Sequence, residues 1–231
     1  MKKSIMTLAL LSCWTTGAMA NWSVTVTGAS DYMFNGVSQT DNDPALQASL
    51  DYAASGGVYA GVWTSNVDYG ASADQELDGY IGHFVQLDES VSVDYGIAYY
   101  TYHGGDDSSE LNYPEMYAKF GYGWGSGTTE ANFWYTWDYF GTGAGHTIVE
   151  IAHTIPLAEN HALRISADSS NSLDGDKWSW EGSDTSYQHV KIAWQTSWQG
   201  FAIEVAAENT TLDSELADER IVVAVSRTFS F

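Results

Sequence analysis

Charged side chains in this chain recur at every second position within short segments whose other positions are apolar. In the segment 91–99, for example, Asp94 lies between Val93 and Tyr95. Because successive side chains of a strand point to opposite faces, this spacing predicts one charged face and one apolar face. A face with more carboxylates than bases would attract cations and repel anions. The candidate residues of the charged face are Asp51, Asp78, Asp94, Glu115, Lys119, Glu130, Asp138, Glu150, Arg164, Asp168, Lys191, Glu204 and Arg220.

No catalytic motif accompanies these charges. The sequence has neither a His-Glu-x-x-His zinc motif nor a Gly-x-Ser-x-Gly nucleophile turn. A membrane-embedded lipase or acyltransferase would need a Ser–His pair, and the sequence places no such partner beside His83 or His153. The acidic segments 41–43, 106–107 and 174–176 could hold Ca²⁺, but none has the twelve-residue calcium-loop pattern. We therefore expect no enzyme, no cofactor and no metal centre.

The elements that must position these charges are predicted to be β-strands. Alternation with a period of two runs through most of the chain after residue 20, and no amphipathic helical segment of useful length is present. Many of the segments reach the ~9–11 residues that a tilted strand needs to cross a bilayer. The twelve expected strands span roughly 22–34, 44–54, 57–67, 75–87, 91–103, 112–122, 128–139, 146–157, 161–169, 187–198, 201–210 and 219–231.

The links between these segments alternate in length. Short links follow every even-numbered strand, as at 55–56 and 199–200, whereas longer and often acidic links follow every odd-numbered strand, as at 35–43 and 170–186. Short turns on one rim and long loops on the other are typical of transmembrane β-barrels. The sequence therefore predicts an all-β fold, a closed antiparallel transmembrane barrel with short periplasmic turns and longer acidic extracellular loops.

The apolar face of the strands is predicted to contact lipid. Ionisable residues are nearly absent from it, and His83, His153 and Arg227 are the exceptions within strands. A charge at the lipid midplane would cost roughly 2–4 kcal/mol, although Arg227 is close enough to the chain end to extend its side chain to the interface. Trp178, Trp180, Trp194 and Trp198 are expected mainly in an aromatic belt at the membrane interfaces. The residues expected to face lipid include Tyr95, Ile97, Phe133, Tyr135, Val149, Ile151, Ile192 and Val223.

The first twenty residues have the pattern of a secretory signal peptide. Two lysines precede a short apolar core over 5–11, and Ala18-Met19-Ala20 forms an A-x-A cleavage site. One alternative is a lipoprotein cleavage box at 10–13, which would make Cys13 a lipidated N-terminus. We favour a signal peptide over 1–20, export by the Sec pathway, and a barrel domain over 21–231. That domain has no cysteine and hence no disulfide.

The charge balance excludes a nucleic-acid partner. The whole chain carries 30 acidic and 8 basic residues, a net charge of −22; removal of Lys2 and Lys3 leaves 6 basic residues and a net charge of −24. Such a chain repels nucleic acid and anionic headgroups unless cations bridge them. Its 10 Trp, 15 Tyr and 8 Phe nevertheless argue against a disordered acidic chain.

The chain ends with an alternating strand that terminates in Phe231. A terminal aromatic residue of this kind is typical of bacterial outer-membrane proteins. We therefore expect the outer membrane of a Gram-negative cell as the location. The expected partners are outer-membrane lipid and lipopolysaccharide, the barrel-assembly machinery, which would recognise the strand ending at Phe231, and small polar solutes or cations.

A family pattern is present in the segments 30–41, 43–47, 57–67, 76–80, 95–102 and 225–229. Together these segments resemble the TorF family of porins. The resemblance covers nearly the whole chain after the signal peptide and is densest in its first half. It implies an outer-membrane porin-like barrel without an agreed substrate, and it carries over no site residues. Asn35 departs from the pattern, because a basic residue is expected there.

Two functions are compatible with a barrel of this size. Barrels of about 8 strands are filled by side chains, whereas 16–18 strands leave a wide aqueous channel, so about 12 strands lie between these cases. The first function is passive diffusion of small solutes with weak cation selectivity, because the inward acids outnumber the bases. The alternative is a non-conducting structural barrel whose interior is plugged by ion pairs.

Overall fold

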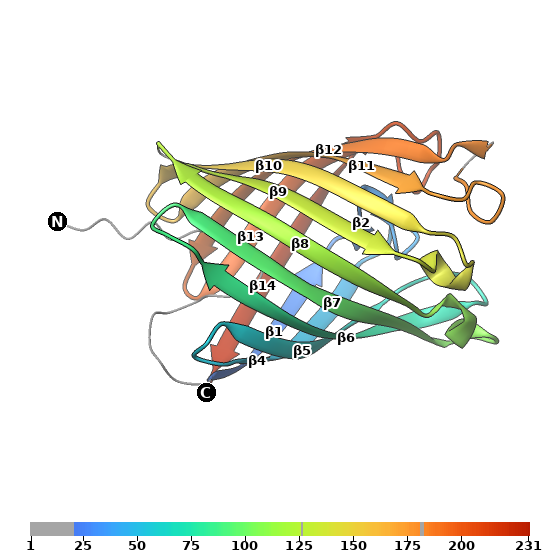
Figure 1. Cartoon of the computed structure of the whole chain (residues 1–231), viewed down its shortest axis with the longest axis horizontal. Helices are drawn as coiled ribbons and strands as arrows, with labels where there is room; N and C mark the ends of the chain where they lie inside the picture. Colours follow the sequence, from blue (N-terminus) through green and yellow to red (C-terminus); the bar gives the residue numbers. More distant parts are fainter. Residues whose placement is uncertain (1–20, 126, 181–182) are drawn as a thin grey trace.

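A computed structural model of the protein describes residues 21–125, 127–180 and 183–231; the predicted signal peptide over 1–20 lies outside the described residues. These residues form a closed antiparallel barrel of twelve strands, which confirms the predicted fold class (Figure 1). The barrel strands are β1 (Asn21–Ala29), β4 (Ala45–Ala53), β5 (Val58–Asn66), β6 (Ala73–Gln86), β7 (Val91–Gly104), β8 (Tyr113–Trp124), β9 (Gly127–Thr136), β10 (His146–Ala158), β11 (His161–Ser172), β12 (Ser186–Trp198), β13 (Phe201–Thr210) and β14 (Arg220–Ser230).

The barrel closes between its first and last strands. β1 pairs with β14 in register from Ser23 opposite Ser230 to Ala29 opposite Ala224. Beyond this ladder, the Trp22 amide donates to the Phe231 carbonyl at 3.2 Å, and the Phe231 amide donates to the Trp22 carbonyl at 3.0 Å. Closure pairs the backbone groups that an open sheet would leave at its edges, which is the condition for crossing lipid with strands.

The two rims of the barrel differ in the length of their connections. At the short-turn rim, β12 and β13 are joined by Gln199–Gly200, whose φ values of 49° and 82° suit a two-residue hairpin turn. At the long-loop rim, the connections span 30–44, 67–72, 105–112, 137–145, 173–185 and 211–219. Figure 1 shows the short turns and the C-terminus together at the left end of the barrel. None of the described helices is long and apolar enough to cross a membrane.

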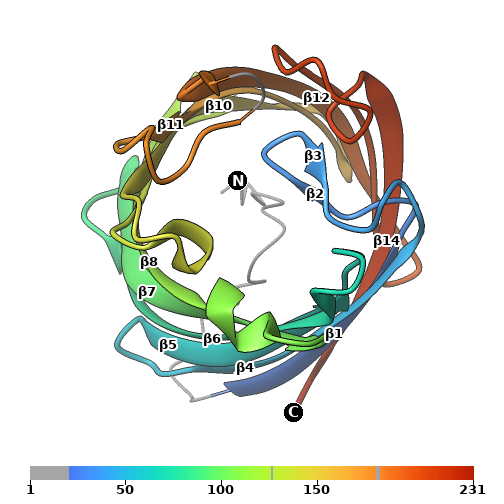
Figure 2. The ribbon, with the colours of Figure 1, turned by 90° about the vertical axis from the view of Figure 1, so that its right-hand side faces the viewer.

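The first long connection does not continue the first strand. We expected a strand over 22–34, but β1 ends at Ala29, and Met33–Phe34 (β2) pairs with Val37–Ser38 (β3) in a separate small hairpin. Asn35 and Gly36 form its turn with φ values of 48° and 78°, a left-handed pair that favours Asn-Gly. Figure 2, a view into the long-loop rim, shows this hairpin inside the barrel.

Two more boundaries differ from the prediction. The strand expected over 128–139 ends at Thr136, and Tyr139–Gly141 forms a 3₁₀ turn (η2) instead. The strand departs there because Tyr139 and Phe140 pack into an aromatic cluster at the mouth of the barrel. The strand expected over 161–169 extends to Ser172. A second 3₁₀ turn, η1, spans Ser108–Leu111.

The alternation of faces is confirmed. All eight residues predicted to face lipid are exposed on the outer surface, with Ile151 at 55% and Ile192 at 52%. The rings of Trp194 and Trp198 are also exposed, at 39% and 63%. Trp178 instead packs inside the aromatic cluster with Trp180, so the predicted belt position is wrong for this pair. Local alternation does not reveal this contact, because both residues lie in the connection that follows β11.

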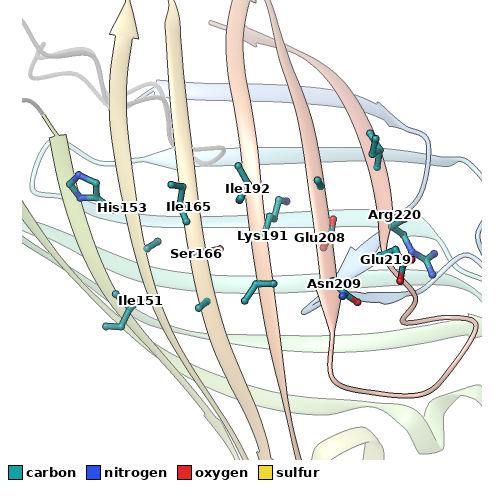
Figure 3. A pocket seen from close by; sticks show the side chains of 15 residues that line it. Ile151, His153, Ile165, Ser166, Lys191, Ile192, Glu208, Asn209, Glu219 and Arg220 are labelled. Carbon is teal, nitrogen blue, oxygen red and sulfur yellow. The ribbon is translucent and has the colours of Figure 1, made fainter.

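A shallow hollow of about 1060 Å³ crosses the outer wall from β10 to β14. The register places Ile165 beside Ile192 and Ile192 beside Ala207, and Figure 3 shows Ile151, Ile165 and Ile192 on neighbouring strands. The hollow arises because Ala167 and Ala207 are small residues among larger isoleucines. It belongs to the apolar outer surface, and the charged candidate residues belong to the opposite face.

The three ionisable residues that the sequence places on the apolar outer face, His83, His153 and Arg227, each have a local partner. The two ring nitrogens of His83 lie 3.0 Å from the Tyr95 hydroxyl and 2.9 Å from the Gly56 carbonyl oxygen. His153 is hydrogen-bonded to Thr129 at 2.9 Å. The guanidinium group of Arg227 lies against the Phe201 and Phe229 rings, 4.9 and 5.2 Å from their centroids.

Candidate functional site

The strand register joins the inward-facing charges into continuous rows around the barrel. Each row crosses several strands, because side chains that face each other across a ladder lie on the same face of the sheet. Two rows carry most of the predicted charges. The first runs Asp94, Lys119, Asn132, Glu150, Asp168, His189. The second runs Glu130, Ala152, Ser166, Lys191, Glu208, Arg220.

On strands β9 to β14, which we call the ion-paired wall, carboxylates are matched by bases. Arg164 pairs with Glu130 and, at 3.0 Å, with Glu150, while Lys191 pairs with Glu204 at 2.9 Å. The side chains are only partly covered: Arg164 is 23% exposed, Glu130 24% and Lys191 30%. Because these side chains point into the barrel, their exposed parts face the lumen.

On strands β4 to β8, which we call the acidic wall, carboxylates are bound by tyrosines instead. Tyr59 donates to Asp94 at 2.6 Å, and Tyr80 donates to Asp51. Nearer the long-loop rim, Tyr100 donates to Glu115 at 2.9 Å, and Tyr102 donates to Glu76 at 3.3 Å. No salt bridge to Lys or Arg joins any of these carboxylates within the described part of the chain. Lys119, at the edge of this wall, lies over the rings of Tyr117 and Trp134.

A buried triad joins the ion-paired wall to the inserted hairpin. His189 lies between Asp168 at 2.7 Å and Glu208 at 3.0 Å. The Asn35 side chain donates to Asp168 at 3.3 Å, and the Tyr187 hydroxyl donates to the Asn35 carbonyl at 3.0 Å. The turn of the hairpin is thus fastened to the inner wall, and the lumen is narrowed there.

The hairpin is fastened a second time at its base. Arg220 donates to Asp31 at 2.7 Å and also to Asn42. Asp31 in turn accepts hydrogen bonds from Ser38 at 2.7 Å and Thr40 at 2.9 Å. The sequence predicts Arg220 as an inward charge. In the structure its guanidinium group binds the 30–44 connection that carries the hairpin.

Aromatic rings fill the lumen beside the hairpin. Val67, Ala73, Tyr102, Tyr113 and Tyr139 form a buried cluster that the rings of Trp178 and Trp180 join from a long loop. His146 stacks on Tyr139 with ring centroids 4.0 Å apart. Hairpin and aromatic cluster together narrow the lumen at the long-loop rim, whereas the middle of the ion-paired wall stays accessible.

Most of the predicted charged residues lie on strands at the expected parity. Asp138 is different, because it follows the end of β9 and its carboxylate accepts a hydrogen bond from the Gly143 amide at 2.7 Å. Its placement on a strand was therefore wrong. The sequence reasoning also omitted four inward ionisable residues, although the alternation could have found them from their neighbours on the same face: Glu76, His146, His189 and Glu208.

Among the described residues, no group of three or more His, Cys, Asp or Glu side chains is arranged to hold a metal ion. The carboxylates are thus distributed along the wall and do not converge on a point.

Comparison with known proteins places the chain in a family. Residues 15–229 match the model of a bacterial protein family of unknown function, Gcw_chp. The chain belongs to the Gcw_chp family. A comparison with curated proteins gives no significant match.

Two porins of known structure have a similar fold. The NanC porin is 8% identical over 89% of this chain and 98% of its own, with a TM-score of 0.60. The KdgM porin is 6% identical over 90% of this chain and 99% of its own, with a TM-score of 0.61, both alone and in complex with disordered oligogalacturonate. At such low identity the likeness concerns the fold: the Gcw_chp chain is a porin-like barrel.

Proposed function

We propose that this Gcw_chp protein is a narrow outer-membrane channel for passive diffusion of small solutes. The observation that carries the proposal is the partial exposure of Arg164, Glu130 and Lys191 on the inward face. Charged groups in a dry, low-dielectric interior would cost several kcal/mol each unless fully paired. Exposed ion pairs inside a barrel are stable when water fills the space around them, and a hydrated lumen is a diffusion path.

The proposed channel prefers cations. On the ion-paired wall, Lys191 and Arg164 offset nearby carboxylates, and Arg220 is engaged by the hairpin. On the acidic wall, carboxylates have tyrosine hydroxyls as partners, and a hydroxyl leaves the negative charge in place. An excess of carboxylates along a narrow path attracts cations, as rings of Asp and Glu do in cation channels.

The location and partners follow from the same proposal. The resemblance to TorF-family porins and the fold of NanC and KdgM support the outer membrane as the site of action. The exposed apolar outer face would contact lipid and lipopolysaccharide. Export would use the Sec pathway through the segment 1–20, and the strand ending at Phe231 would be recognised by the barrel-assembly machinery.

The test is ion conductance of the purified full barrel domain in a planar lipid bilayer. Under a KCl gradient, we expect a reversal potential of the sign for K⁺ over Cl⁻. The preference should be larger at 0.01 M than at 1 M salt, because the screening length falls from about 30 Å to about 3 Å. A chloride preference would refute the selectivity.

One observation favours the plugged barrel as the second candidate function, namely the hairpin and aromatic cluster at the long-loop rim. The same bilayer experiment separates the two. Correctly folded barrels, identified by their heat-dependent mobility on gels, that insert and carry no current would establish the plugged barrel and refute the channel.

A further inference from the structure

Arg227 is the one lysine or arginine on the outer face of the described barrel strands. It shares the outward parity of Val223, Val225 and Phe229 on β14, and like them it is exposed. The other basic residues of the described chain lie on the inner face or in a long loop: Lys119, Arg164, Lys177, Lys191 and Arg220. A charge on the lipid face is costly near the midplane and tolerated only near an interface, so the depth of Arg227 matters.

The register places Arg227 at the level of the short-turn rim. It lies directly opposite Phe201, the first residue of β13, which follows the two-residue turn at 199–200. Phe201 is in turn opposite Trp198, whose side chain is 63% exposed. Exposed aromatic side chains mark the interface of a transmembrane barrel, where lipid headgroups begin. The guanidinium group therefore lies at the depth of headgroup phosphates.

The guanidinium group of Arg227 has no carboxylate partner in the described part of the chain. The two other arginines there both pair with a carboxylate inside the barrel. Arg227 instead lies against the rings of Phe201 and Phe229. A guanidinium group carries five N–H donors in a planar fork, and a phenyl ring offers it no oxygen acceptor. These donors can therefore bind an anion that comes from outside the protein.

The two rings hold the guanidinium group in place. Phe201 faces it from the adjacent strand, and Phe229 lies two residues further along β14 on the same face. The guanidinium carbon is 4.9 Å from the first ring centroid and 5.2 Å from the second. Attraction between a cation and ring faces restricts a long side chain, so less freedom is lost when a ligand binds. The planar fork matches two oxygens of a phosphate group.

We propose that Arg227 binds the phosphate group of a phospholipid in the periplasmic leaflet. The leaflet follows from the rim, because the short turns of a transmembrane barrel face the periplasm. The fork would donate to two phosphate oxygens, and the acyl chains would lie along Val225 and Val223, which continue the apolar face from Arg227 toward the midplane.

The charge of the whole protein makes this site distinguishable from general attraction. A chain with a net charge of −22 repels anionic lipid, so tight binding of such a lipid requires a local positive group. The proposal rests on the proposed location in a membrane and does not depend on whether the lumen conducts.

Binding is measured by native mass spectrometry of the folded barrel in a non-ionic detergent, titrated with phosphatidylglycerol. We expect one lipid to bind more tightly than any further lipid, and at least tenfold more weakly in Arg227→Gln. The matched control is Lys177→Gln, which removes one positive charge from a long loop and should change the affinity by less than twofold. Equal weakening in both variants would mean a general effect of charge and would overturn the site.

Two further ligands separate the parts of the lipid. A diacylglycerol with the same acyl chains lacks the phosphate and should bind the parent and Arg227→Gln equally weakly. Inorganic phosphate lacks the acyl chains and should displace little lipid even in hundredfold excess. Diacylglycerol binding as tight as that of phosphatidylglycerol would reduce the site to apolar contact, and displacement by inorganic phosphate would assign it to a free anion. Either result would overturn the proposal.

Arg227→Lys tests the fork without removing the charge. We expect binding three- to tenfold weaker than in the parent, because an ammonium group cannot donate to two phosphate oxygens in the same planar geometry. Folding of each variant is checked by its heat-dependent mobility on gels. Unchanged affinity in a folded Arg227→Lys barrel would refute the two-oxygen contact that defines the site.

Lipid binding and conductance fail independently. A barrel that conducts K⁺ and binds no phosphatidylglycerol keeps the proposed channel and refutes the lipid site. A barrel that binds this lipid at Arg227 and carries no current refutes the channel and supports the lipid site.

Discussion

Replacing Ile151 by Arg is the most direct test of how the barrel faces its surroundings. Ile151 is 55% exposed on the outer surface, near the middle of β10 and opposite Ala131 and Ala167 on the adjacent strands. In lipid, an Arg near the bilayer midplane costs roughly 2–4 kcal/mol relative to an apolar residue. Since about 1.4 kcal/mol is a factor of ten in an equilibrium constant, the equilibrium constant for folding should fall by a factor of roughly 30 to 700.

Glu150, the preceding residue, provides the control. It points inward, where it accepts hydrogen bonds from Asn132 at 2.7 Å and from Arg164 at 3.0 Å. We expect Glu150→Gln to be much milder, because the amide keeps an oxygen acceptor and Arg164 keeps Glu130 as a partner. Glu150→Arg should also impair barrel assembly less than Ile151→Arg, although it places a second guanidinium group near Arg164.

The assay is refolding from urea into lipid vesicles, followed by the heat-dependent gel mobility of the folded barrel. The urea midpoint of Ile151→Arg should fall well below those of the parent and of both Glu150 variants. The reasoning would be refuted if Ile151→Arg refolded like the parent, or if all three variants lost the same stability. Either result would mean that Ile151 does not contact lipid.

Two further predictions concern the C-terminal residue and the hairpin at the long-loop rim. Deleting Phe231 removes the two backbone hydrogen bonds that join it to β1 and should lower the amount of barrel inserted in the outer membrane; unchanged insertion would exclude a role in assembly. Gly36→Ala should release the hairpin and raise the single-channel conductance, because a Cβ atom there would be 2.5 Å from the His189 ring. Gly70→Ala is its control, since Gly70 also has a positive φ but nothing lies within 4 Å of the added Cβ atom; equal conductance in the two variants would contradict a constricting hairpin.

The sequence by itself determined which side of each strand faces outward. The period of two is a local property of the backbone, and the outward residues must be apolar along the whole strand. Ile97 and Ile192 could therefore be placed on the outer surface without knowledge of any neighbouring strand. The same alternation also places Glu208 and His189 on the inner face, so both could have been predicted from their neighbours on the strand.

Tertiary structure alone decided which inward groups are partners. Arg164 of β11 meets Glu130 of β9 across β10, and Tyr80 of β6 meets Asp51 of β4 across β5. The register and tilt of a closed sheet bring these residues together although they are far apart in the chain. The path of the long loops could not be predicted from the sequence either. Asn35 and Gly36 predict a turn. Whether that turn points to solvent or into the lumen depends on its contacts with Tyr187 and Asp168, which lie more than 130 residues further along the chain. Contacts between residues so far apart in the sequence form when the barrel closes, so no local sequence pattern predicts them.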